Sequence, residues 1–148
     1  MGTSDFNASH TTGHIYTFRL KPNEDLKLSL HQFAIQNNIQ AAIMLTCVGS
    51  LQHYNLRFAS QAQGNSGSGH FEIVSLVGTF SYSSLHLHLC ISDSKGQTIG
   101  GHLLDQNLIY TTAEIAVAEL PHLIFDRDLD ASTGYRELVI RPRNIHEK

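Results

Sequence analysis

The chain has 148 residues, of which 41% are hydrophobic and 16% are charged, and its formal net charge is −3 with histidine neutral. This composition is typical of one soluble globular domain and excludes a disordered chain. No apolar run approaches the roughly 20 residues that a membrane-spanning helix needs. The acidic balance also disfavours a DNA-binding surface, because neutralisation of phosphates by Lys and Arg dominates such affinity.

The first third of the chain predicts a strand, a helix and two more strands. Alternation over 14–20 predicts a strand, and apolar residues at helical spacing over 24–37 predict an amphipathic helix with Asn23 as its candidate N-cap. A dense apolar run at 41–48 predicts a central strand. Gly49-Ser50 is expected to end it, and a further strand is expected from Leu51 to Ala59.

The rest of the chain is strand-rich and contains one low-complexity stretch. Residues 60–69 are rich in Gly, Ser and Gln and are expected to form a flexible surface loop. Ile124 to Arg127 is expected to start an irregular segment that continues from Asp128 to Gly134. Further strands are predicted at 71–80, 84–92, 97–103, 107–120 and 137–141.

These elements predict an α+β domain. We expect a mainly antiparallel sheet of about seven to eight strands, with one main helix packed on it, over residues 14–143. Residues 1–13 and 144–148 are expected to be a flexible N-terminal segment and a C-terminal tail. The first twelve residues lack the basic start and apolar stretch of a secretory signal. Cys47 and Cys90 lie in strand-like runs and are expected to be free thiols, which favours a reducing cytoplasm.

The most informative segment is the alternating stretch from Leu85 to Ile91. Its aliphatic residues fall on one face of a strand, and His86 and His88 fall on the other, about 6.5–7 Å apart. A turn at 92–97 would bring His102 back alongside them. Three imidazoles can hold one metal ion and leave a position open, and zinc is the metal that best suits such a set. The sequence therefore predicts a zinc site at His86, His88 and His102.

Several alternatives stay open around these histidines. The histidines can instead be satisfied by hydrogen bonds in a polar face or an interface. Cys90 shares their face and is a candidate fourth ligand, although a thiol in such a strand is more often part of the core. Gly100-Gly101 is expected to mark a bulge or the close approach of another chain, where a Cβ would collide.

Two glutamates lie within apolar strands, Glu72 and Glu114. A buried carboxylate needs a partner, so we expect either to pair with Arg19 or Arg57. The alternative is that one of these glutamates orients a metal-binding histidine by hydrogen bonding to its other ring nitrogen, or acts as a general base.

The motifs, taken together and in order, resemble the PPC (plant and prokaryote conserved) domain family. The resemblance covers Tyr16 to Pro142 and rests on Asp25-Leu26, Gly49-Ser50, Gly69 to Leu76, Gly78-Thr79-Phe80, His86-Leu-His88, Gly100 to Leu103 and Tyr110 to Glu114. It implies a compact α+β fold and a homotrimer, with the three histidines near a subunit contact and able to take a metal.

The chain departs from the family pattern in two places. His70 stands where the family often has arginine, which puts in doubt any role that needs a guanidinium there. The Arg-Gly-Arg-Pro segment of the plant AT-hook proteins is absent, and with it their minor-groove contact.

The leading hypothesis is a non-catalytic homotrimeric protein with a histidine metal site that acts as a DNA-associated or regulatory binding module. The DNA association rests on the family and its plant relatives, and a protein partner is equally open. The alternative is a zinc-dependent enzyme acting on a small molecule, with Glu72 or Glu114 as general base. A third hypothesis is a purely structural trimer whose histidines fill the interface.

Overall fold

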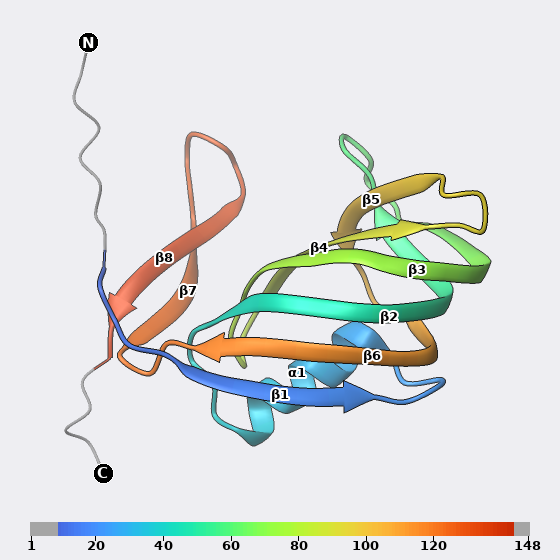
Figure 1. Ribbon diagram of the computed structural model, residues 1–148. Helices are drawn as coiled ribbons and strands as arrows, with labels where there is room; N and C mark the ends of the chain where they lie inside the picture. Colours follow the sequence, from blue (N-terminus) through green and yellow to red (C-terminus); the bar gives the residue numbers. More distant parts are fainter. Residues whose placement is uncertain (1–8, 144–148) are drawn as a thin grey trace.

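A computed structural model describes residues 9–143, so most of the predicted N-terminal segment (1–8) and the predicted tail (144–148) lie outside the described residues. Within 9–143 the chain forms one helix and eight strands (Figure 1). In chain order they are β1 (His14–Leu20), α1 (Leu26–Gln36), β2 (Ala42–Arg57), β3 (Asn65–Phe80), β4 (Leu85–Ser92), β5 (Thr98–Leu103), β6 (Leu108–Glu119), β7 (Leu123–Leu129) and β8 (Arg136–Pro142). The predicted α+β class is confirmed.

Six strands form one antiparallel sheet in the order β1-β6-β2-β3-β4-β5. The far end of β2 also pairs with β5, so that Leu56 lies opposite Leu103 and Arg57 lies opposite His102. This pairing folds the sheet back on itself at one end. Strands β7 and β8 form a separate hairpin that stands beside the sheet (Figure 1).

The helix packs on one face of the sheet through Leu26, Leu30 and Ala34, which are fully buried and recur at four-residue spacing. Its N-cap is Asp25, whose carboxylate accepts a hydrogen bond from the Leu28 amide at 3.0 Å. The prediction of Asn23 as N-cap is wrong, because Asn23 adopts φ +70° in the turn before the helix. The helix therefore begins two residues later than its predicted start.

Strand β2 runs without interruption through Gly49-Ser50, so the predicted break there is wrong. Gly49 has φ +153°, and a Cβ on it would lie 2.0 Å from the carbonyl oxygen of Thr112. The glycine lets β6 approach β2 closely where the ladder is irregular, and it therefore permits a bend without ending the strand.

Strand β3 begins at Asn65, so the predicted flexible loop at 60–69 is only partly correct. Ser66 and Gly67 pair with Asn55 and Tyr54 of β2. A Cβ on Gly67 would lie 2.8 Å from the Tyr54 ring, so the glycine makes room for that ring over the strand. The small residues therefore serve close packing here and do not indicate a loop.

Strand β7 was not predicted. An irregular segment was expected to begin at 124–127, but these residues belong to β7, which runs to Leu129 and pairs with Arg136 of β8. The turn that follows is held by Asp130, whose carboxylate accepts hydrogen bonds from the amide and the hydroxyl of Ser132 at 2.7 Å and 2.6 Å. Such local bonding is typical of aspartate in turns.

The outer face of the sheet, away from α1, carries apolar side chains that are exposed in the single chain. Val48, Val74 and Val77 are 56%, 57% and 55% exposed. They lie on β2 and β3, at the centre of the sheet. In the part of the chain described, no helix is both long and apolar enough to cross a membrane.

Candidate metal centre

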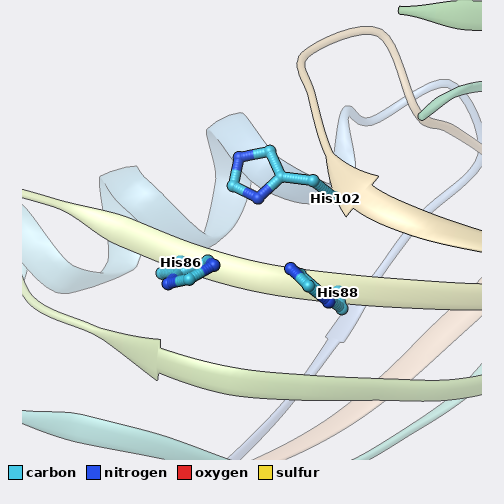
Figure 2. Close-up of side chains that lie close together, drawn as sticks. All are labelled: His86, His88 and His102. Carbon is cyan, nitrogen blue, oxygen red and sulfur yellow. The ribbon is translucent and has the colours of Figure 1, made fainter. Parts of the chain in front are cut away.

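Strand β4 separates its side chains as the alternation predicts. Leu87, Leu89 and Ile91 are buried in the core. His86 and His88 project from the opposite face, and His88 lies directly opposite His102 of β5 in the strand register. Figure 2 shows the three rings gathered on one side of β4. The structure therefore brings together the three histidines that the sequence singled out; we call them the histidine cluster.

The cluster has the dimensions of a metal site that needs only small adjustments. One ring nitrogen from each histidine can be chosen so that all three lie within 4.8 Å of one another. The ring centroids are 5.2, 5.3 and 5.6 Å apart. Nitrogens bound tetrahedrally to zinc at about 2.0–2.1 Å lie about 3.4 Å apart. Rotation of the side chains about their own bonds can close this difference.

His102 carries an unsatisfied nitrogen. Its Nδ1 is buried and has no hydrogen-bond partner among the described residues. A buried nitrogen without a hydrogen bond lowers the stability of a native protein. A bound ion is one explanation for such an atom. A metal ion held by the cluster would give this nitrogen a partner.

The surroundings of two cluster histidines favour their neutral form. Burial lowers the pKa of His102 to about 4, with further lowering from the Arg57 charge and the neighbouring histidines. Burial also lowers the pKa of His86, assisted by Arg127 and His88 and opposed by Glu137. A histidine binds metal only in its neutral form. Two of the three imidazoles are therefore in the metal-binding form at neutral pH.

The double glycine before His102 sets the position of that residue. A Cβ on Gly101 would lie 2.8 Å from the carbonyl oxygen of Arg57. The sequence predicted a bulge or the close approach of another chain here, but the neighbour in the structure is strand β2 of the same chain. Because β5 lies this close to β2, His102 is held over β4 and beside Arg57.

Two pockets flank the cluster. One, of about 450 Å³, includes His88, His102, Cys90 and Gly101 in its lining. The other, of about 440 Å³, lies between the sheet and the β7–β8 hairpin, and it is lined by His86, His102, Leu85, Tyr135, Glu137 and three arginines, Arg57, Arg127 and Arg136. We call the second one the arginine pocket. The sequence did not identify it, because its arginines come from three separate strands.

The two predicted glutamates lie elsewhere in the single chain. Glu72 and Glu114 are both exposed, so the premise that they are buried is wrong. Glu72 lies opposite Ser92, at the other end of β4 from His86. Glu114 lines a separate pocket with Arg19, but Arg19 donates a hydrogen bond to Thr112 at 2.8 Å instead. In residues 9–143 neither glutamate forms the expected ion pair.

The buried carboxylate of the sheet is Glu119, which sequence analysis missed. It accepts a hydrogen bond from the Tyr16 hydroxyl at 3.0 Å and lies 3.3 Å from His14 Nδ1. Burial raises the pKa of Tyr16, and the hydrogen bond to Glu119 and the charge of that carboxylate raise it further. Tyr16 and His14 reach Glu119 from β1 across the β1–β6 ladder. This group is structural and lies outside both pockets that flank the cluster.

The remaining predicted residues occupy different surroundings. Cys47 and Cys90 are free thiols, as expected, and burial raises the pKa of Cys47 to about 12. Cys90 lines the pocket beside His88 but lies outside the histidine cluster. His70 stacks on Tyr110 with ring centroids 4.0 Å apart, in a pocket that also includes Glu72.

Known proteins resemble this chain over most of its length. Residues 7–121 match the Plants and Prokaryotes Conserved (PCC) domain. The chain is 46% identical over 128 residues to the Bifunctional protein GlmU of a Synechococcus strain, a match that covers 86% of this chain. It spans only 20% of the length of that relative.

Solved structures share the fold. A hypothetical protein from Salmonella cholerae-suis has a TM-score of 0.91 at 40% identity, over 92% of this chain and 99% of the other. At 21% identity and a TM-score of 0.73, a metal-containing protein from Archaeoglobus fulgidus matches over 90% of this chain and 99% of its own. A candidate DNA-binding protein from Bacteroides thetaiotaomicron has a TM-score of 0.74 at 20% identity. The match covers 88% of this chain and 98% of the other chain.

Proposed function

This chain belongs to the Plants and Prokaryotes Conserved (PCC) domain family, and we propose that it is a metal-binding module whose histidine cluster holds a zinc ion. One observation carries the proposal: three imidazole nitrogens, one from each of His86, His88 and His102, lie within 4.8 Å of one another. The buried, unpartnered Nδ1 of His102 supports it. So does the name of the Archaeoglobus relative, which is a metal-containing protein of the same fold.

Zinc fits the chemistry of the donor set. Imidazole suits zinc, and three protein ligands leave one position for water or another ligand. The cluster borders two pockets, which keeps that position accessible. A structural zinc site would be closed by a fourth protein ligand. In the part of the chain described, Cys90 is the nearest thiol along β4, and it does not join the cluster.

We also propose that the protein works as a homotrimer in the cytoplasm. The family resemblance implies three copies. The exposed Val48, Val74 and Val77 support burial of the outer sheet face against another copy, because a bare apolar patch on a sheet favours association. A reducing cytoplasm would keep Cys47 and Cys90 as the free thiols they are.

The proposal includes a DNA-associated or regulatory role. It rests on the names of relatives such as the Bacteroides protein. The net charge of −3 opposes it. The arginines around the arginine pocket are the basic groups that would meet a phosphate, and they are too few for tight nonspecific binding.

The second candidate function is a zinc-dependent enzyme that acts on a small molecule. The accessible pocket of about 440 Å³ beside His86 and His102 favours it, since ligand pockets are typically of this size. Among the pocket residues the carboxylate is Glu137. In a single chain, Glu137 is therefore better placed than Glu72 or Glu114 to serve as a general base.

Zinc-dependent stabilisation tests the metal proposal. We expect zinc at about one hundred times its Kd to stabilise the wild-type protein by about 2.7 kcal/mol, because it binds only the folded state. His86→Ala, His88→Ala and His102→Ala should each abolish most of this effect, while His10→Ala should keep it. Unchanged stabilisation in the three variants would exclude the cluster as the metal site.

A further inference from the structure

In the part of the chain that the structure describes, the three guanidinium groups of the arginine pocket have no carboxylate partner. Arg57 comes from the end of β2, Arg127 from β7 and Arg136 from the start of β8. Among residues 9–143, no carboxylate oxygen lies within 4.0 Å of any of them. Arg127 and Arg136 each donate to the other's backbone carbonyl, at 3.3 Å and 3.2 Å. Such neutral contacts orient the arginines and leave their charges uncompensated.

The acidic groups of the hairpin are satisfied elsewhere. Asp126 and Asp128 both contact Arg141, at 3.5 Å and 2.7 Å. Glu137 lines the arginine pocket, and its carboxylate accepts a hydrogen bond from the Thr133 hydroxyl at 3.0 Å. The pocket therefore holds three positive charges against one negative charge.

A metal in the histidine cluster makes this imbalance larger. His86 and His102 line the arginine pocket as well as the cluster, so a divalent cation there would lie at the pocket's edge. Its ligands are neutral imidazoles and add no negative charge. Like charges brought together in a partly desolvated site repel strongly, so the metal-loaded pocket favours an anion.

We propose that the arginine pocket binds the carboxylate or phosphate group of a small molecule, with one oxygen of that group taking the open position on the metal. The inference rests on the proposed metal site and adds the chemical class of its ligand. Carboxylate and phosphate oxygens match the planar fork of arginine, which binds them through paired hydrogen bonds. A pocket of about 440 Å³ has room for the anionic group and a small organic body.

The test uses cobalt(II) in place of zinc, because its visible absorption reports a change of ligand at the metal. The loaded protein is titrated with sodium acetate and, separately, with inorganic phosphate, against sodium chloride at the same ionic strength. We expect acetate or phosphate, but not chloride, to change the spectrum in a saturable way. The anion that binds more tightly shows whether the pocket prefers a carboxylate or a phosphate group.

Two arginine variants assign the effect to the pocket. Arg57→Gln and Arg136→Gln should each weaken the anion's effect about tenfold or more, the loss expected for a charge-assisted hydrogen bond, while cobalt binding persists. Arg19→Gln, in a separate pocket on the edge strand β1, should leave the effect of the anion unchanged. Arg136 is exposed, so its replacement does not threaten the fold.

The possible failures are distinguishable. Cobalt binding with no anion-dependent change, or an anion effect equal in all three arginine variants and the wild type, would overturn the anion site and leave the metal site intact. Failure of the wild-type protein to bind cobalt or zinc at all would overturn the proposed function itself.

Discussion

His88 and His102 are register partners across β4 and β5, and their ring centroids lie 5.6 Å apart. This cross-strand pair makes the histidine cluster a property of the sheet, since neither residue lies on a mobile loop. His86 joins from two residues along β4, with its ring 5.3 Å from that of His102. Ligands placed on paired strands are positioned more firmly than ligands on loops.

Gly78 is a position where the fold near the cluster can be tested. It has φ +138°, and a Cβ there would lie 2.1 Å from the carbonyl oxygen of His86. Gly78→Ala should lower the free energy of unfolding by about 3 kcal/mol or more. The alanine would be strained at this positive φ, and the backbone of β4 would also have to move to make room for its Cβ. Gly96→Ala, at φ +76° with no atom within 4 Å, should cost about 1 kcal/mol. Equal losses in chemical denaturation would contradict the close packing of β3 on β4.

The metal-free protein should lose stability on mild acidification. The pKa of His102 is about 4 in the folded state, below its ordinary value of 6.5. The unfolded chain therefore binds more protons between these values, so the free energy of unfolding falls as the pH drops from about 6.5 towards 4. It should not change through His102 above that range. Chemical denaturation of the wild type and of His102→Gln at pH 7 and pH 5 measures this change in the free energy of unfolding.

The His102→Gln variant is the control, since glutamine does not titrate. Its loss of stability between the two pH values should be smaller than that of the wild type. An equal or larger loss would show that His102 is not held in its neutral form by the fold.

Assembly should depend on the outer sheet face. Val74→Glu would place a charge beside the exposed Val48 and Val77, and should dissociate the proposed trimer. Leu129→Glu, at a residue that is 70% exposed on the hairpin, should not. Sedimentation equilibrium distinguishes the 16.4 kDa monomer from an assembly of three. A monomeric wild-type protein at micromolar concentration would refute the trimer.

DNA binding should be weak or absent at neutral pH. The net charge of −3 and the missing AT-hook predict nothing tighter than about 10⁻⁶ M for generic duplex at near-physiological salt, with steep loss as salt is raised. A fluorescence anisotropy titration measures both features. Submicromolar affinity at near-physiological salt would contradict this prediction.

Much of the fold followed from local patterns, and the errors have physical causes. The alternation from Leu85 to Ile91 predicted both faces of β4, because the strand period is strictly two. The range 60–69 was misjudged because small residues that normally favour loops instead make room for Tyr54. Gly49 was read as a break because the close approach of Thr112 is a tertiary contact that local composition does not show.

The candidate site also contains residues that local sequence patterns predicted and residues that they did not. The three histidines were found because two share a strand and the third follows a short turn, so their spacing carried the signal. Arg57, Arg127 and Arg136 were missed because they come together only when the hairpin stands beside the end of β2. Glu72 and Glu114 looked buried from their apolar neighbours, but alternation places both on the exposed side of their strands.

The zinc content of the protein after zinc addition and exhaustive dialysis tests the central claim most directly. We predict about one zinc ion per chain in the wild type, and release of that ion in acid, because protons compete for the imidazoles. His10→Ala should retain the same content, and each cluster variant should retain little. A wild-type protein that stays metal-free after this treatment would contradict the account and leave the three histidines as a hydrogen-bonding set.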